Sequence, residues 1–282
     1  MNMLEGDVVL VLGGGSGLGL GIARHCIAEG ARVAIMEIAE EKLAALKPEL
    51  GAEVLLFHGD VTSVEDLTAC RRAVVERWGR LNALIGSQGI FDGNVPLREV
   101  PVERVAPLFD ELFHVNVLGY FLAARVFGDL LEDSAGAIVL TSSVAAYAAD
   151  GGGLMYTATK GAVVSAVRQL ALEFAPRVRV NGVAPGAIAD SQLRGPRALG
   201  LDHFKQSDVP KDAMLATYRT LSLMRELPTP LEYAPIYAFL ASRHNTVVTG
   251  QTVLLEQGAL NRAMLSAPGM TGGVGAGLTP RP

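Results

Sequence analysis

The first thirty residues constrain the fold of this chain most. Asp7 to Leu12 (DVVLVL) is an apolar run, typical of a strand buried on both faces of a parallel sheet. The glycine-rich turn GGGSGLG follows at positions 13 to 19, and a helical pattern then runs to a closing glycine, Gly30. This order places backbone N–H groups at a helix N-terminus, where they bind phosphate groups. The sequence therefore predicts a nucleotide site on its first strand and helix.

Strand and helix patterns continue to alternate as far as about position 255. Further strands are predicted at 32–36, 53–57, 81–85, 137–140, 177–183 and 252–255. Helices are predicted at 40–50, 64–78, 101–131, 155–175 and 230–241. This alternation indicates an α/β fold, a single-domain Rossmann-type doubly wound parallel sheet of about seven strands with helices on both faces.

No break in composition divides the chain, so residues 1–265 are predicted to form one domain. Positions 190–225 are expected to be irregular and polar, and to form a loop that sets the substrate pocket. Residues 266–282 are rich in glycine and proline, and they are predicted to form a flexible tail or to order against a neighbouring subunit.

Composition narrows the possible partners. The 282 residues include 50% hydrophobic types and carry a net charge of −5 without a strongly basic stretch, which argues against nucleic acid. No apolar run reaches the roughly 18 residues of a membrane span, and no signal peptide is recognisable, so we expect a cytoplasmic protein. Cys26 and Cys70 lie in helical patterns and suggest structural thiols in a reducing compartment. The histidines and cysteines show no metal-ligand spacing, so no metal is expected.

The glycine turn favours a dinucleotide over a nucleoside triphosphate. A triphosphate loop needs Gly-Lys-Ser/Thr, but the first lysine of the chain is Lys42. Glu37 ends the second strand about twenty residues further on, where a carboxylate accepts hydrogen bonds from the adenosine ribose and repels a 2′-phosphate. We therefore predict NAD rather than NADP, with a solvated acid at a strand end as the alternative. Asp60, beside Val61, could reach the adenine amino group or could cap the helix that starts near Val64.

A second candidate site lies between Leu140 and Ala162, where a strand, three glycines and a helix follow one another. Tyr156 and Lys160 are four residues apart on that helix and therefore share a face. A nearby cation stabilises a phenolate and lowers the pKa of tyrosine from its ordinary value near 10. Ser143 stands at the strand end, where its hydroxyl can reach the same place. The alternative is an ordinary surface pair of tyrosine and lysine.

These motifs together resemble the short-chain dehydrogenase/reductase family. The resemblance rests on the glycine turn, Asp60-Val61, Asn116, Pro185-Gly186 and a serine thirteen residues before Tyr156-x-x-x-Lys160. It implies that Tyr156 is the general acid/base, that Lys160 lowers its pKa and binds the nicotinamide ribose, and that Ser143 polarises the reacting oxygen. It also implies that Asn116 kinks its helix and anchors a water in a proton relay.

The resemblance further implies a set of cofactor contacts and a homotetramer or homodimer. The expected NAD-binding residues are Gly13, Ser16, Gly17, Leu18, Gly19, Glu37, Asp60, Val61, Gly89, Tyr156, Lys160, Pro185, Gly186 and Ile188. The chain departs from the family pattern at three places: Leu12 where threonine is usual, Ser87-Gln88 where Asn-Ala precedes the glycine, and Asp190 where threonine is often found after Pro-Gly-x-x-x. Val144 is a departure from one group within the family, the aromatic cis-dihydrodiol dehydrogenases, which often have asparagine after the serine.

Within the family, the segments at 109–120, 151–162, 172–183 and 193–200 look like those of bacterial aromatic cis-dihydrodiol dehydrogenases. That resemblance implies NAD-dependent oxidation of a cis-dihydrodiol of an aromatic compound to a catechol. One alternative is an NAD-dependent dehydrogenase of another secondary alcohol, alicyclic or terpene. The other is a protein that binds NAD without turnover, and the intact Ser143, Tyr156 and Lys160 argue against it.

Overall fold

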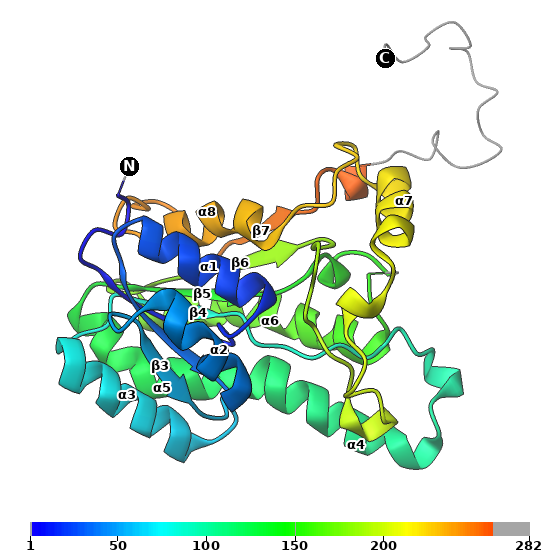
Figure 1. Ribbon diagram of the computed structural model, residues 1–282, viewed down its shortest axis with the longest axis horizontal. Coiled ribbons are helices and arrows are strands. Elements are labelled where there is room, and N and C mark those ends of the chain that lie inside the picture. The colour runs from blue at the N-terminus through cyan, green and yellow to red at the C-terminus, as the bar shows by residue number, and fades with distance from the viewer. Residues whose placement is uncertain (1, 150, 262–282) are drawn as a thin grey trace, which may run out of the picture.

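A computed structural model describes residues 2–149 and 151–261 of the chain (Figure 1). Within this described part, seven parallel strands form one sheet in the order β3-β2-β1-β4-β5-β6-β7. The strands are β1 (Val8–Leu12), β2 (Arg32–Glu37), β3 (Leu55–His58), β4 (Ala83–Gly86), β5 (Ala137–Thr141), β6 (Arg179–Pro185) and β7 (Thr252–Leu255). This confirms the predicted doubly wound parallel sheet.

Helices cover both faces of the sheet (Figure 1). They are α1 (Gly17–Ala28), α2 (Glu40–Leu50), α3 (Val64–Trp78), α4 (Val102–Phe113), α5 (Gly119–Asp133), α6 (Leu154–Phe174), α7 (Lys211–Leu221) and α8 (Pro230–Ala241). Side chains of α1, α2 and α8 share one apolar core with the sheet, and side chains of α3, α5 and α6 share the other.

The first strand shows why its sequence pattern is continuously apolar. All five residues of β1 are buried, and they alternate between the two cores. Val8, Leu10 and Leu12 pack on the side of α3, α5 and α6, whereas Val9 and Val11 pack on the side of α1 and α8. Complete burial of such a side chain contributes about 1.5–3 kcal/mol, so both faces of this strand stabilise the fold.

The strand order reverses at β1, because β2 and β3 lie on one side of it while β4 to β7 lie on the other. In open α/β sheets, ligands bind outside the carboxyl ends of the strands at such a switch point. The glycine turn follows β1 directly and therefore lies at this point. The fold alone places a ligand site where the sequence motifs converge.

The predicted helix at 101–131 is interrupted. Residues His114–Leu118 form a π-helical turn between α4 and α5, and Asn116 lies in its middle. The Asn116 side chain hydrogen-bonds the backbone N–H and C=O of Ile90, at 2.9 and 3.0 Å. A π-helical turn is frequent at functional sites. Because the amide is fastened to another segment, we attribute the irregular turn to that contact.

The segment predicted to be irregular at 190–225 contains a helix, so that prediction was wrong for α7. Pro210 precedes the helix, and Tyr218 is its buried residue. The other α7 side chains are more exposed, which explains why the segment reads as polar. The tail predicted at 266–282 lies outside the described residues.

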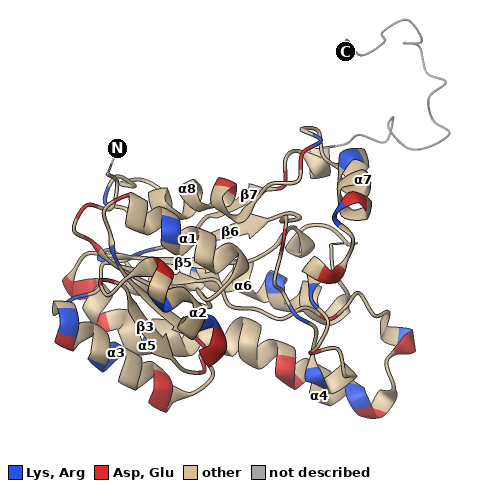
Figure 2. Ribbon diagram, in the orientation of Figure 1, with Lys and Arg blue, Asp and Glu red and all other residues tan. Residues whose placement is uncertain are grey.

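The two cysteines lie on opposite faces of the sheet, Cys26 on α1 and Cys70 on α3. Burial raises the pKa of each thiol to about 12, so both are protonated and structural at neutral pH. None of the helices described has the length and apolar character that crossing a membrane requires. Figure 2 shows acidic and basic residues interspersed along α3 and α4.

Candidate active site

One cavity of about 1220 Å³ opens at the carboxyl ends of the strands. Pockets for one small ligand usually measure about 300–1,000 Å³, so this cavity has room for a dinucleotide and a small substrate together. All the residues predicted to contact the cofactor line it, and so does Ser143. Of the predicted catalytic residues, Asn116 alone is not among the lining residues.

The glycine turn is held closed by contacts that exclude larger side chains. A Cβ atom on Gly19 would overlap the carbonyl oxygen of Gly13, so α1 can begin this close to the turn only with glycine. The Glu37 carboxylate accepts a hydrogen bond from the Gly15 N–H at 3.1 Å. Glu37 is 6% exposed and lies 3.8 Å from Lys42, so the alternative of a solvated acid is wrong.

Asp60 lies at the end of β3 and lines the cavity. Its carboxylate accepts hydrogen bonds from the backbone and the hydroxyl of Thr62, both at 2.8 Å. The cap of α3 is Ser63, whose hydroxyl accepts the N–H of Asp66 at 3.1 Å. The helix-cap alternative for Asp60 is therefore wrong, and its side chain orders the turn at the edge of the cavity.

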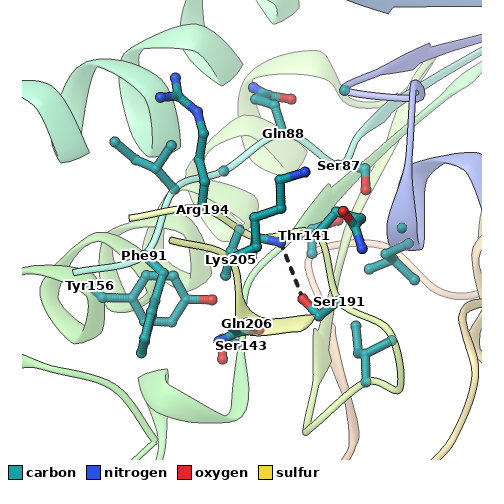
Figure 3. Close-up of a pocket in the computed structure, with 18 of the residues that line it drawn as sticks. Ser87, Gln88, Phe91, Thr141, Ser143, Tyr156, Ser191, Arg194, Lys205 and Gln206 are labelled. Carbon is teal, nitrogen blue, oxygen red and sulfur yellow. Dashed lines mark hydrogen bonds between the residues drawn. The ribbon is translucent and has the colours of Figure 1, made fainter. Parts of the chain in front are cut away.

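Tyr156 and Lys160 both lie on the buried face of α6, at 7% and 2% exposure. The Lys160 Nζ is 5.4 Å from the centroid of the Tyr156 ring and donates a hydrogen bond to the Thr141 carbonyl at 3.1 Å. Ser143 follows β5, and its hydroxyl accepts the N–H of Ala145 at 3.2 Å. In Figure 3 the Tyr156 hydroxyl points toward the centre of the cavity.

The pKa values of this pair are set mainly by burial. Burial raises the pKa of Tyr156 to about 12, which the hydrogen bond with Ser143 partly offsets and the charge of Asp92 reinforces. Burial also lowers the pKa of Lys160 to about 8. In the protein alone the pKa of Tyr156 is therefore not lowered as the sequence suggested, because desolvation outweighs the hydrogen bond with Ser143.

Asn116 connects two walls of the site. Besides its two hydrogen bonds to Ile90, its amide donates to the Thr159 hydroxyl on α6 at 3.1 Å. The side chain is completely buried. Asn116 thereby fixes the segment after β4 against the helix that carries Tyr156 and Lys160.

The sequence interpretation missed Asp92, which lies 2% exposed in the same region. Its carboxylate accepts the backbone N–H groups of Gly153 and Tyr156, both at 2.9 Å. Negative charge at a helix N-terminus stabilises the helix, so Asp92 anchors α6 at the turn that carries the tyrosine. The sequence signal was weak: an acid next to an aromatic residue after the fourth strand.

Asp92 also explains the triple glycine before Tyr156. A Cβ atom on Gly153 would overlap the Asp92 carboxylate. A Cβ atom on Gly152 would lie 2.5 Å from the Tyr156 ring, and one on Gly151 would lie 2.8 Å from the Ala145 Cα. Each glycine is therefore needed for close approach to a neighbouring group.

We expect Gly153→Ala to destabilise the protein, because it displaces the Asp92 carboxylate and leaves two N–H groups of α6 unpaired. Unpaired buried groups cost about 1–3 kcal/mol each. Urea unfolding measures this cost. The matched control is Gly161→Ala on the same helix, where a Cβ meets nothing within 4 Å, and where helix propensity predicts a gain of up to about 1 kcal/mol. Equal stabilities of the two variants would contradict the role of Asp92.

The departures at Ser87 and Gln88 place polar side-chain atoms in a buried position behind the wall of the cavity. The Ser87 hydroxyl and both polar atoms of the Gln88 side chain have no hydrogen-bond partner among the described residues. Figure 3 shows both side chains at the cavity. Buried polar groups normally find partners, so these unpaired atoms mark the place where the chain departs from the family pattern.

The departure at Asp190 is explained by its neighbour. Asp190 has a φ of 57°, and its carboxylate is 71% exposed, 3.8 Å from Lys211. Ser191, one residue later, is buried and lines the cavity. Ser191 therefore brings a hydroxyl to the cavity one position after the expected threonine, and the sequence interpretation did not single it out.

The sheet order, the glycine turn and the cavity at the carboxyl ends of the strands have the layout of a Rossmann-type nucleotide-binding site, and the buried Tyr156–Lys160 pair lies on its wall. A sequence model described as enoyl-(acyl carrier protein) reductase matches residues 13–259. The chain belongs to the short-chain dehydrogenase/reductase family of oxidoreductases, whose dehydrogenases use nicotinamide cofactors.

Similar proteins cover nearly the whole chain. The cis-2,3-dihydrobiphenyl-2,3-diol dehydrogenase of Pseudomonas sp. strain KKS102 is 41% identical over 94% of this chain and 95% of its own. The cis-1,2-dihydrobenzene-1,2-diol dehydrogenase of Pseudomonas putida is 39% identical over the same shares. The 3-phenylpropionate-dihydrodiol/cinnamic acid-dihydrodiol dehydrogenase of Escherichia coli O8 is 40% identical over 87% of this chain and 89% of its own.

Proposed function

We propose that this protein oxidises a cis-dihydrodiol of an aromatic compound to a catechol, with NAD as the hydride acceptor and Tyr156 as the base. The observation that carries the proposal is the convergence of Ser143, Tyr156, Lys160 and the glycine turn on one cavity. The names of the similar proteins support the substrate class. The size of the cavity is compatible with a ring diol bound beside a dinucleotide.

The residues present fit a dinucleotide. The N–H groups of the glycine turn and the start of α1 would hold the pyrophosphate. Glu37 would accept hydrogen bonds from the adenosine ribose, and Asp60 lies near enough to the same edge to contact the adenine. Glu37, Asp60 and residues of the glycine turn line the same cavity. When bound, NAD would accept the hydride.

In the proposed mechanism, the Tyr156 phenolate accepts the proton of the substrate hydroxyl as the carbinol carbon loses its hydride. Ser143 donates a hydrogen bond to the same oxygen and holds it toward Tyr156. Burial raises the pKa of Tyr156 to about 12 in the protein alone, so the phenolate has to be stabilised in the complex, by the Lys160 ammonium and by the positive charge of the bound nicotinamide. Asn116 keeps both walls of the site in place. In the resulting hydroxyketone the neighbouring carbon loses its proton and the ketone oxygen gains one, which gives the catechol, so aromatisation draws the reaction forward.

A panel of substrates tests this function. We expect the protein to reduce NAD with the cis-dihydrodiols of benzene, toluene or biphenyl, and to reduce it much more slowly with alicyclic and terpene alcohols. The absorbance of NADH measures both rates. Faster turnover of the alcohols would show that the substrates are secondary alcohols of that kind and not cis-dihydrodiols. Binding of NAD without its reduction by any member of the panel would reject the catalytic proposal.

The preference for NAD is expected to depend on the charge of Glu37. Glu37→Gln keeps the shape of the side chain and an acceptor for the Gly15 N–H, but it removes repulsion of a 2′-phosphate and frees Lys42. We expect the ratio of kcat/KM for NAD to that for NADP to fall about tenfold, roughly 1.4 kcal/mol. An unchanged ratio would contradict the role of Glu37. The control is Glu41→Gln, which removes the charge of another acid that lines the cavity.

A further inference from the structure

Two cations of the 190–225 segment face each other at the cavity. Arg194 and Lys205 are directly opposite in an isolated antiparallel bridge. The backbone hydrogen bonds that flank the bridge run from Gly195 to Phe204 and from Gln206 to Leu193, both at 3.0 Å. This pattern makes Arg194 and Lys205 a non-hydrogen-bonded pair, in which opposing side chains are closest, with Cβ atoms about 4.5–5.5 Å apart.

Neither cation is neutralised within the described part of the chain. No carboxylate there lies within 4.0 Å of the Arg194 guanidinium or the Lys205 ammonium. The nearby acids have other partners: Asp202 is 3.9 Å from Arg197, Asp190 is 3.8 Å from Lys211, and Asp208 accepts the backbone N–H of Lys205. Like charges directly opposite each other destabilise a strand pair, and a bound anion would remove that cost.

This pair lies close to the reacting centre. Both residues line the same cavity as Tyr156, and the Arg194 carbonyl accepts the Phe91 N–H at 2.8 Å. The Phe91 ring in turn stands edge-on against the Tyr156 ring, with 5.2 Å between centroids. In Figure 3 the Arg194 and Lys205 side chains start close together and spread apart toward their charged ends, with a gap between the two cations. The charges are thus placed where a ligand of the cavity can meet them.

We propose that Arg194 and Lys205 form an anion subsite that binds an oxyacid group, and this proposal rests on the proposed function. The planar guanidinium binds a carboxylate or a phosphate with two parallel hydrogen bonds, and the ammonium adds a second charge. Two molecules can bring such a group into this cavity. One is a ring diol that carries a carboxylate side chain, and the other is the dinucleotide with its pyrophosphate.

The test compares Arg194→Gln and Lys205→Gln with the wild-type protein on two substrates, the cis-dihydrodiols of 3-phenylpropionate and of toluene. Calorimetry measures the Kd of NAD for each protein. The control is Arg197→Gln on the same segment, whose guanidinium is already near Asp202. If the anion is the substrate carboxylate, each variant raises KM for the charged diol about 10- to 100-fold and leaves the toluene diol and NAD within about twofold.

A different set of changes would identify the pyrophosphate of the dinucleotide as the bound anion. If the Kd of NAD rises about 10- to 100-fold while both diols respond alike, the subsite binds the pyrophosphate. If neither variant changes any of these constants beyond the control, the anion subsite is rejected. A readout without turnover is thermal stabilisation by 3-phenylpropionate alone, which Arg194→Gln should abolish in the substrate case. If neither diol is turned over, the proposed function fails, while the thermal and NAD measurements still decide the subsite.

Discussion

Replacing Tyr156 by phenylalanine is expected to lower kcat for ring-diol oxidation by about 10³-fold, within the range for loss of a general base. The change removes the hydroxyl that points into the cavity but keeps the ring that packs edge-on against Phe91. The fold and the binding of NAD should therefore remain. Steady-state kinetics with NADH absorbance and calorimetric titration with NAD measure the two effects separately.

Ser143→Ala is a useful companion to this variant, because it removes a hydrogen-bond donor to the reacting oxygen but leaves the base. We expect a smaller loss of kcat for Ser143→Ala than for Tyr156→Phe. Substantial turnover by a well-folded Tyr156→Phe protein with intact NAD binding would show that the proton goes elsewhere.

Lys160→Met is expected to lower kcat by about 10²-fold or more while making the protein more stable at pH 7. Burial lowers the pKa of Lys160 from 10.5 to about 8, so holding its charge inside the folded protein costs about 3 kcal/mol at neutral pH. Methionine has similar length and no charge. The gain is reduced by loss of the hydrogen bond from Nζ to the Thr141 carbonyl.

The difference in stability between Lys160→Met and the wild-type protein is expected to depend on pH. Between pH 8 and 10.5 the unfolded chain holds a proton on Lys160 that the folded protein has lost, so wild-type stability rises with pH relative to the variant. The advantage of Lys160→Met is therefore largest below pH 8 and shrinks as the pH rises toward 10. Urea unfolding at several pH values checks this, with Lys47→Met at an exposed position as the control. A variant less stable than wild type at pH 7 would contradict the cost of the buried charge.

The layout of the fold could be predicted because its signals are local. Strands buried on both faces, such as β1, have uninterrupted apolar runs, and α2, α3, α8 and β7 have the predicted bounds. The irregular turn at Asn116 has no such local signal, because its side chain bonds to Ile90, 26 positions away, and a kink there was expected only from the family resemblance. The α7 helix was missed because it buries too little of its surface to show a clear apolar period.

The same distinction applies to the candidate site. The glycine turn, Glu37 and the Tyr156–Lys160 pair were found because each belongs to a short motif at a strand end or on one helix face. Asp92 meets the α6 N-terminus from about sixty positions away, and its partner glycines identify it only in the structure. The spacing of residues in the sequence also does not predict the pKa of Tyr156, because that pKa depends mainly on how completely the side chain is desolvated.

The contacts of Asp92 and Phe91 divide the site into parts that can change independently. Asp92 fastens the segment after β4 to α6, so the base and the wall beside it form one unit. The 190–225 segment joins that unit through the backbone bond from Phe91 to Arg194, which does not depend on side-chain identity. Leu193, Ala198 and Leu199 of this segment pack against the apolar cluster that holds Phe91 and Tyr156. Side chains of the segment outside that cluster can therefore be exchanged to admit other ring substituents, by laboratory evolution or by natural drift, without displacing the proposed base.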